Sequence, residues 1–254
     1  MTTELRGILN ALSTPFDASG AINDEQMRWL VDRSVDAGIN AVVVGGGTGE
    51  FAWLTHDERR QIFDVVLEHA AGRIPVVAQT GGMTPGEAIA LSKAAEASGA
   101  DALMVSLPYY EPLSLKEVTR YLHEVAGSVE IPIMLYNNPV TTGVSMDVDT
   151  LVRFSRDIPN VKYVKDSSRN WEQALRLIHY HSDDLKLIIG WDSFGFSALL
   201  EGAAGVMAGA ANLVPYELAA FYSAFESGDI PAARAAWYRV FPLLDTLVDM
   251  PFSQ

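Results

Sequence analysis

The sequence predicts a single (β/α)₈ barrel, and three observations support that fold. The chain has 254 residues, close to the ~250 that one such barrel usually takes. Eight short and almost wholly apolar runs recur along it, which suits parallel strands buried on both faces. Segments of helical periodicity separate these runs, so strands recur every ~20–35 residues, as repeated βαβ units require. Eight units favour a closed barrel, with an open doubly wound sheet as the alternative.

The eight candidate strands are, in chain order, Gly7–Leu12, Ala41–Gly45, Pro75–Gln79, Ala102–Ser106, Pro132–Tyr136, Val161–Lys165, Lys186–Ile189 and Gly205–Ala208. Between them, Thr55-His-Asp-Glu58 and Ser114-Leu-Lys-Glu117 have the form of capping boxes at helix starts. Thr84-Pro85 places a proline at a first helical position. Glycines also follow several helical runs where a C-terminal cap is expected, at Gly38, Gly99 and Gly127.

The composition excludes several classes of partner and chemistry. The formal net charge is −14, and so acidic a surface repels phosphate backbones and anionic lipid, which argues against nucleic acid and membrane surfaces as partners. The absence of cysteine excludes disulfides, thiolate nucleophiles and sulfur-ligated metals, and it fits a reducing cytoplasm. No stretch approaches ~18 uninterrupted apolar residues, so we expect neither a signal peptide nor a membrane span. The sequence therefore predicts a soluble, cytoplasmic protein.

A glycine-rich loop, Gly45-Gly-Gly-Thr-Gly-Glu50, follows the second predicted strand. Glycines at the C-terminal end of a barrel strand let backbone N–H groups turn together toward an anion, and the Thr48 hydroxyl adds a donor. A dinucleotide-binding fingerprint needs glycine where this chain has Glu50, and no Walker lysine follows. A small carboxylate is therefore a better candidate ligand for this loop than a nucleotide or a phosphate. The alternative is a tight turn that binds no ligand.

The sixth predicted strand ends in a lysine. In Val161-Lys-Tyr-Val-Lys165 the alternation of a strand places Lys165 on one face and Lys162 on the other. Burial at the end of an apolar strand disfavours the ammonium form of a lysine, and the neutral amine is the form that attacks a carbonyl. A lysine in such a place can also be a salt-bridge partner, so its neighbours decide between the two interpretations.

Tyr136 ends the preceding strand and is followed by Asn137-Asn-Pro-Val-Thr-Thr-Gly143. Because neighbouring strands of a parallel barrel end at the same rim, we expect Tyr136 to lie beside Lys165. A phenol there can relay protons during carbinolamine formation. The alternative is an amphipathic side chain at the edge of the core.

In this order, the motifs resemble the dihydrodipicolinate synthase / N-acetylneuraminate lyase superfamily over essentially the whole chain. Further agreement comes from Leu107-Pro-Tyr-Tyr110, Gly190-x-Asp192 and the glycine-rich run Gly202–Asn212. The resemblance implies class I chemistry, in which Lys165 forms a Schiff base with a 2-oxo acid. It implies no cofactor and no metal.

The resemblance also implies roles for further residues. Tyr136 would relay protons, and the Gly47–Thr48 segment would hold the substrate carboxylate. Thr141 and Met207 would contribute to the substrate-binding site. Tyr110 matches a tyrosine that in many members reaches into the site of a neighbouring subunit, which implies a homo-oligomer, either a dimer or a tetramer.

Two departures from the family pattern bear on the reaction. The synthases carry an arginine for the carboxylate of their aldehyde substrate where this chain has Thr141, and a hydroxyl residue where it has Gly47. The second departure interrupts a tyrosine–threonine–tyrosine relay. The Gly-Gly-Thr-Gly-Glu-Phe run and the Lys-Asp pair instead resemble members that dehydrate or cleave 2-oxo-3-deoxy sugar acids. Arg169, four residues past Lys165, is the candidate to replace the missing arginine.

The main hypothesis is accordingly a Schiff-base-forming lyase, an aldolase or a dehydratase, acting on pyruvate or on 2-oxo-3-deoxy sugar acids. The first alternative is a dihydrodipicolinate synthase, which condenses pyruvate with aspartate semialdehyde. The second is a non-catalytic protein that binds a 2-oxo acid. A phosphate-binding isomerase barrel is disfavoured because no basic residue stands near Gly202–Gly209 to pair with phosphate.

Two further patterns carry no functional prediction. His179 and His181 stand two residues apart on a predicted helix and do not face one another, so we expect no metal site there. The tryptophans share no spacing that suggests a ligand-binding box, at Trp171, Trp191 and Trp237.

Members of the superfamily usually extend several tens of residues further, as a helical C-terminal region. We expect the barrel to occupy residues 1–228 and this region to begin within residues 229–254. The chain ends at Phe252-Ser-Gln254 without an evident cap, which indicates either a short member or a trimmed sequence.

Overall fold

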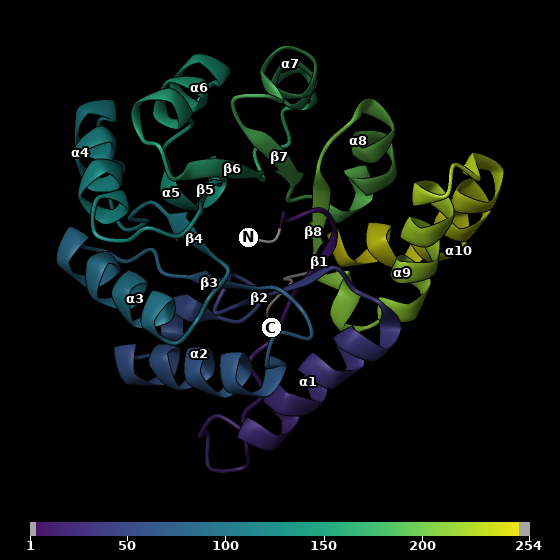
Figure 1. Ribbon diagram of the computed structural model, residues 1–254, viewed down its shortest axis with the longest axis horizontal. Helices are drawn as coiled ribbons and strands as arrows, with labels where there is room; N and C mark the ends of the chain where they lie inside the picture. The colour runs from purple at the N-terminus through teal and green to yellow at the C-terminus, as the bar shows by residue number, and fades with distance from the viewer. Residues whose placement is uncertain (1–3, 249–254) are drawn as a thin grey trace.

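The computed structural model describes residues 4–248, in which eight parallel strands close into one barrel ringed by helices (Figure 1). Each strand pairs with the next along the chain, and β1 closes the ring by pairing with β8. The (β/α)₈ barrel predicted from the sequence is confirmed. The strands are β1 (Gly7–Ala11), β2 (Ala41–Val44), β3 (Val76–Gln79), β4 (Ala102–Ser106), β5 (Ile133–Asn137), β6 (Val161–Asp166), β7 (Lys186–Ile189) and β8 (Gly205–Ala208).

Helices occupy the connections between the strands. They are α1 (Asp24–Ala37), α2 (His56–Ala70), α3 (Pro85–Ala97), α4 (Leu115–Ala126), α5 (Pro139–Thr142), α6 (Val148–Asp157), α7 (Trp171–His181), α8 (Gly195–Glu201), α9 (Pro215–Glu226) and α10 (Ile230–Val248), together with the 3₁₀ turns η1 (Phe51–Trp53), η2 (Asp192–Phe194) and η3 (Ala210–Asn212). Among the helices of residues 4–248, none combines the length and the apolar character that crossing a lipid bilayer requires.

The helix ends form where the local sequence predicts them. The Thr55 hydroxyl accepts from the Glu58 N–H, and the Glu58 carboxylate accepts in return from the Thr55 N–H at 2.7 Å. Ser114 and Glu117 form the same reciprocal pair at the start of α4. Gly38 ends α1 with φ 81°, a left-handed conformation that glycine adopts without steric cost. These caps set the lengths of the strand–helix connections.

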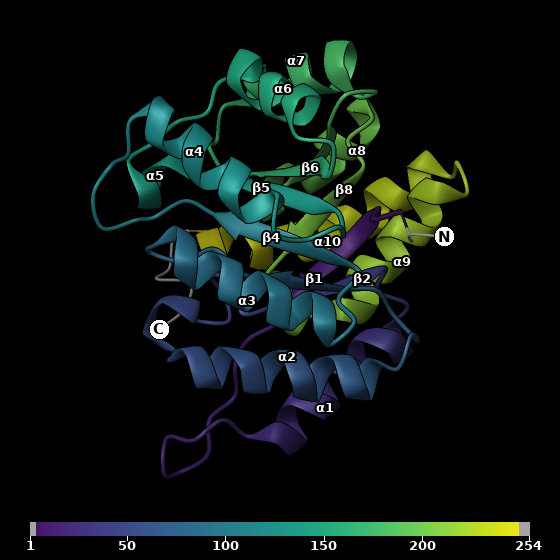
Figure 2. The same ribbon diagram turned by 60° about the vertical axis from the view of Figure 1, so that its left-hand side comes forward.

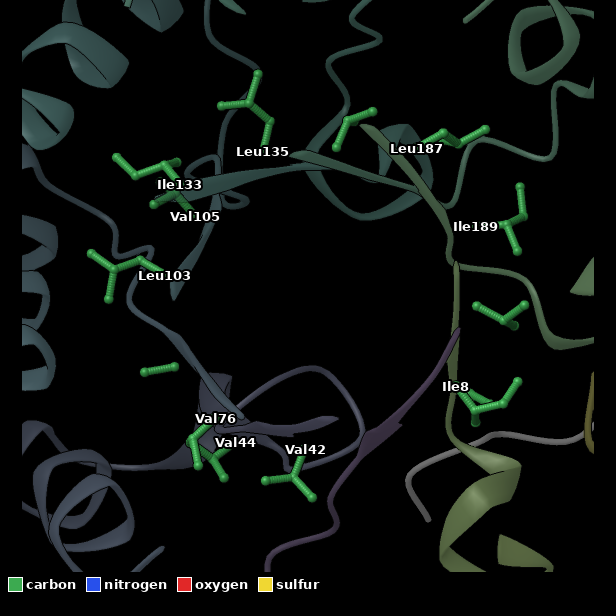
Figure 3. Packing of buried hydrophobic residues seen from close by; sticks show 14 of the residues in the cluster. Ile8, Val42, Val44, Val76, Leu103, Val105, Ile133, Leu135, Leu187 and Ile189 are labelled. Carbon is green, nitrogen blue, oxygen red and sulfur yellow. The ribbon is translucent and has the colours of Figure 1, made fainter. Parts of the chain in front are cut away.

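The alternation along the strands separates two cores. Residues that point away from the barrel axis pack against the surrounding helices, as Figure 3 shows for Ile8, Val42, Leu103 and Leu135. Residues at the alternate positions fill the barrel interior, and the inner cluster includes Leu9, Val43, Met104, Met134, Tyr136, Tyr163 and Met207. Side chains at the C-terminal end of these inner rows therefore face the open end of the barrel.

Helix α10 follows the last barrel helix and packs mainly against α9, with further contacts to η2 and η3. Figure 2 shows α10, in yellow, extending from α9 behind the barrel strands. Its last turns bring Leu244 and Leu247 to the C-terminal end of the barrel. The predicted boundary at residue 228 falls in the turn between α9 and α10 and stays a prediction. Residues 249–254, with the chain end, lie outside the described residues.

Candidate active site

A cleft of about 440 Å³ opens at the C-terminal end of the barrel strands. Its walls come from the ends of β1, β5, β6 and β8, from the loops after β2, β4 and β7, and from α10. Enzymes with this fold carry their active sites at this end. Six of the residues predicted from the sequence line the cleft, namely Gly47, Thr48, Tyr136, Thr141, Lys165 and Met207.

Lys165 and Tyr136 lie side by side in this cleft. They are register partners on β6 and β5, and the Lys165 Nζ lies 4.0 Å from the centroid of the Tyr136 ring. Both side chains are largely buried, with exposures of 7% and 9%. Lys162 points the other way and is exposed, as strand alternation predicts. The cation over the ring face is an attractive contact that holds the amine beside the phenol.

One side-chain amide orients the Tyr136 hydroxyl. The Asn138 Nδ2 donates to the Tyr136 Oη at 3.2 Å and to the Thr141 Oγ1 at 2.9 Å. Burial alone would raise the pKa of Tyr136. The positive charge of Lys165 and polar contacts with Lys165, Ser167 and Asn138 outweigh burial and hold this pKa below its ordinary value. A phenol with a lowered pKa gives up its proton more readily, which suits a proton relay.

The glycine-rich loop after β2 lines the cleft and approaches the Tyr136 hydroxyl. A Cβ built on Gly47 would lie 4.0 Å from the Tyr136 Oη, so the absence of a side chain leaves space beside the phenol. Gly49 has no such space, because a Cβ there would approach the Leu12 carbonyl oxygen to 2.9 Å. The Gly49 carbonyl also accepts from the Thr14 hydroxyl at 2.7 Å. The glycine-rich loop therefore packs closely against the segment that follows β1.

Asp166, the residue after the lysine, connects the loops that follow β5 and β6. Its carboxylate is 2% exposed and accepts from Asn137 Nδ2 at 3.0 Å and from Gln173 Nε2 at 3.2 Å. It also accepts from both the backbone N–H and the hydroxyl of Ser168 at 3.1 Å. Burial raises the pKa of Asp166, and these donors oppose that effect. The carboxylate thus fixes the chain on both sides of the Tyr136–Lys165 pair.

Asp192 and Gly190 follow β7 and line the same cleft. The Asp192 carboxylate accepts from the Ala210 N–H at 2.9 Å. Burial raises the pKa of Asp192, and the N–H groups of Ala210 and Gly209 and the charge of Lys165 oppose it. A Cβ on Gly190 would lie 2.9 Å from the Lys165 Cε, so only glycine leaves room for the lysine stem. The spacing Gly-x-Asp after a strand end was the signal for both residues.

The opposite wall rests on a buried arginine. Arg59 is 2% exposed and donates to the carbonyls of Gln79 at 2.9 Å and Gly81 at 3.0 Å. Its guanidinium lies 5.3 Å from the centroid of the Phe51 ring, and Phe51 meets Tyr109 edge to face at 5.7 Å. Burial lowers the pKa of Arg59 to about 10, so the group stays charged near neutral pH. The sequence periodicity did not indicate that Arg59 is buried behind this wall of the cleft.

Tyr110 is the one predicted site residue that does not line the cleft within residues 4–248. Its side chain is 81% exposed, while the adjacent Tyr109 faces the cleft. The role that the resemblance gives Tyr110, in the site of a neighbouring subunit, stays a prediction. Trp191 shows the opposite outcome, because its spacing suggested no site and yet it lines the cleft.

The barrel, with an amine and a phenol paired at its catalytic end, places the protein among the class I lyases, which act on carbonyl compounds through a lysine amine. Comparison with known proteins gives the family. The chain belongs to the dihydrodipicolinate synthetase family, whose sequence model matches residues 4–254.

Individual relatives agree with this assignment. The 4-hydroxy-tetrahydrodipicolinate synthase of Neisseria meningitidis serogroup C / serotype 2a is 39% identical over 247 residues, which cover 97% of this chain and 84% of that protein. The crystal structure of dihydrodipicolinate synthase from Aquifex aeolicus superposes with a TM-score of 0.92 at 32% identity, covering 97% of this chain and 84% of the other. A prophage protein of E. coli K12 from the same family, solved in complex with pyruvate, gives 0.94 at 29% identity, with 99% and 86% covered.

Proposed function

We propose that the protein condenses pyruvate with aspartate semialdehyde through a Schiff base on Lys165, the reaction of a 4-hydroxy-tetrahydrodipicolinate synthase. The observation that carries the proposal is the 4.0 Å approach of the Lys165 amine to the Tyr136 ring within an open cleft. The E. coli K12 relative in complex with pyruvate supports the first substrate. The name of the Neisseria relative supports the second.

The chemistry follows from the two side chains. The Lys165 amine attacks C2 of pyruvate, and the carbinolamine loses water to leave an iminium ion. This ion is an electron sink, so a C3 proton leaves and an enamine forms. The enamine carbon then attacks the aldehyde carbon, the aldehyde oxygen takes up a proton, and the iminium ion forms again. The amino group of the semialdehyde attacks this iminium carbon and displaces the Lys165 amine, which closes the ring of the product and frees the enzyme. Tyr136 accepts and returns the protons of these steps, while the Asn138 amide keeps its hydroxyl in place.

Two walls of the cleft suit the pyruvate carboxylate and its reacting carbon. The Gly47–Thr48 segment offers backbone N–H groups and a hydroxyl to the carboxylate. Met207 lies in the barrel interior at the end of β8, 2% exposed, where it closes the floor of the cleft. An apolar floor of this kind favours the uncharged enamine nitrogen over the positively charged iminium ion.

The second candidate is an aldolase or dehydratase of 2-oxo-3-deoxy sugar acids, and two observations favour it. Thr141 is uncharged and already bonded to Asn138, so it is a poor partner for a second carboxylate. The space beside Gly47 would admit a hydroxylated substrate chain. Because the named relatives are synthases, we place this candidate second. Membership of an enzyme family disfavours a purely binding protein.

The test is a kinetic comparison on one preparation. Steady-state kcat/KM is measured for pyruvate with aspartate semialdehyde and, separately, for release of pyruvate or loss of water from 2-oxo-3-deoxy acids. We expect the condensation to be the faster reaction. A preparation that turns over a sugar acid efficiently and leaves aspartate semialdehyde untouched would establish the second candidate instead.

We also propose that the protein is a homo-oligomer, a dimer or a tetramer, in which Tyr110 contacts a second copy. Large apolar side chains are exposed next to the cleft, with exposures of 81% for Tyr110, 73% for Trp53 and 81% for Val140. Each of these residues lines the cleft or is next in sequence to a residue that does, and exposed large apolar side chains beside a site can mark an interaction surface. Light scattering after size exclusion should give a mass at least twice that of the chain, and Tyr110→Asp should lower it. A monomer at micromolar concentration would refute this.

A further inference from the structure

We propose that Arg169, stacked on Trp191, binds a second carboxylate of the substrate, distal to the carbonyl that reacts with Lys165. The inference deepens the proposed function, since it states that the partner of pyruvate carries an anionic group and names the residue that recognises it. It applies equally to a sugar-acid substrate with a carboxylate at its far end.

Arg169 lines the cleft together with the reacting lysine. Among the described residues that line the cleft, the cationic side chains are those of Lys165 and Arg169. Because Lys165 is the reacting group, Arg169 is the cationic side chain available to bind a substrate carboxylate. A chain with a net charge of −14 repels anions on the whole, and a cation inside the cleft offsets that repulsion for an anionic substrate. Thr141, on the same side of the cleft, supplies none.

The guanidinium group of Arg169 packs against an aromatic ring. The Arg169 Cζ lies 3.7 Å from the centroid of the Trp191 ring, close enough for stacking on the indole face. Stacking uses the flat face of the guanidinium and leaves its N–H donors free around the edge. Within residues 4–248, Arg169 has no carboxylate at ion-pair distance, whereas Arg59, Arg73 and Arg156 each have one. A planar fork with free donors matches a carboxylate.

The backbone at Arg169 has an uncommon conformation that its neighbours hold in place. Arg169 has φ 60°, a left-handed conformation that is uncommon outside glycine. The turn is held on both sides, because the Ser168 hydroxyl donates to Asp166 and accepts from the Asn170 N–H at 3.1 Å. Asn170 in turn caps α7 through the Gln173 N–H. Strain that its surroundings keep in place is concentrated at functional sites.

Arg169 and the glycine-rich loop lie on opposite sides of the barrel. The Gly47–Thr48 segment follows β2, whereas Arg169 follows β6, four strands away in a closed ring of eight. The two sites therefore face each other across the cleft. A substrate with one carboxylate on the glycine-rich loop presents its other end to Arg169.

Trapping with borohydride tests this without relying on the condensation. Two 2-oxo acids of equal chain length are compared, 2-oxoglutarate with a distal carboxylate and 2-oxopentanoate without one. We expect the unmodified protein to form the reduced Lys165 adduct at lower concentrations of 2-oxoglutarate. Arg169→Gln should raise the half-saturating concentration of 2-oxoglutarate about tenfold to a hundredfold, the worth of a hydrogen bond to a charged group, and leave that of 2-oxopentanoate within twofold. Arg169→Lys should fall between, because it keeps the charge and loses the fork.

Arg153→Gln is the matched control, since Arg153 is also an arginine over an aromatic ring, 5.4 Å from the centroid of Phe154, and lies outside this cleft. It should change neither value. Equal losses for both acids in Arg169→Gln would assign Arg169 to structure alone, and no loss, or no adduct with either acid, would overturn the inference. A protein that traps 2-oxoglutarate through Arg169 yet fails to condense pyruvate with aspartate semialdehyde would retain this inference and lose only the proposed reaction.

Discussion

The Lys165 amine lies over the face of the Tyr136 ring, 4.0 Å from its centroid, where β6 and β5 end. The two residues are 29 positions apart in the chain, and barrel closure makes them neighbours. This contact places the proposed nucleophile and the proposed proton relay in one buried corner of the cleft.

The first prediction concerns the covalent intermediate. Incubation with pyruvate and borohydride should add one reduced pyruvyl group to the protein, on Lys165. Lys165→Ala should abolish the adduct. Lys162→Ala is the matched control and should retain it, because Lys162 is exposed on the other face of β6. Intact-mass and peptide mass spectrometry make the measurement, and an adduct on Lys162 would contradict the mechanism.

The second prediction concerns Tyr136. Tyr136→Phe keeps the packing of the ring and removes the hydroxyl, so kcat should fall by ~10²–10⁴ while the thermal midpoint changes little. Tyr163→Phe is the contrasting variant. It leaves the buried Leu5 N–H without its acceptor at 3.1 Å, which should cost about 1–3 kcal/mol of stability and spare kcat. If Tyr136→Phe retains nearly full turnover, the proton takes another route.

The third prediction concerns ionisation of the phenol. Burial raises the pKa of Tyr136, but the charge of Lys165 and its hydrogen-bonding neighbours bring the pKa below its ordinary value near 10. In an ultraviolet difference titration of the unmodified protein against Tyr136→Phe, one tyrosinate should therefore appear below pH 10. Removing the lysine charge leaves burial dominant, so in Lys165→Ala this pKa should rise. A midpoint that Lys165→Ala leaves unchanged would show that the lysine charge does not act on the phenol.

The fourth prediction uses two glycines of one loop. Gly47→Ser should fold normally, because its Cβ has 4.0 Å of clearance from the Tyr136 Oη, and its hydroxyl comes within reach of the phenol. We expect kcat to rise several-fold as the relay gains a member. Gly49→Ser should instead lose about 1–3 kcal/mol of stability, since its Cβ meets the Leu12 carbonyl at 2.9 Å. Thermal denaturation and kcat measured on both variants provide the check, and a destabilised Gly47→Ser would contradict it.

Much of this fold could be read from local pattern. Eight apolar runs correspond to eight strands, with ends that differ by at most one residue, because a strand ends where its ladder partner ends rather than where apolar residues stop. Strand alternation also separated Lys165 from Lys162, since the side-chain period of two is a local property of the backbone. The capping boxes at Thr55 and Ser114 were predictable for the same reason, because each motif is local and involves two residues three positions apart.

What the sequence by itself determined was therefore the barrel, the rim on which Lys165 and Tyr136 meet, and through its motifs the family. Only the tertiary structure decided how the cleft is completed. The stack of Arg169 on Trp191 joins the loops that follow β6 and β7, and the Asn138 amide bridges Tyr136 and Thr141 through the short helical turn after β5. The direction of a loop side chain follows from backbone angles such as the φ of 60° at Arg169, and no hydrophobic period encodes those angles. Barrel closure sets which loops meet, and that is a property of the whole chain.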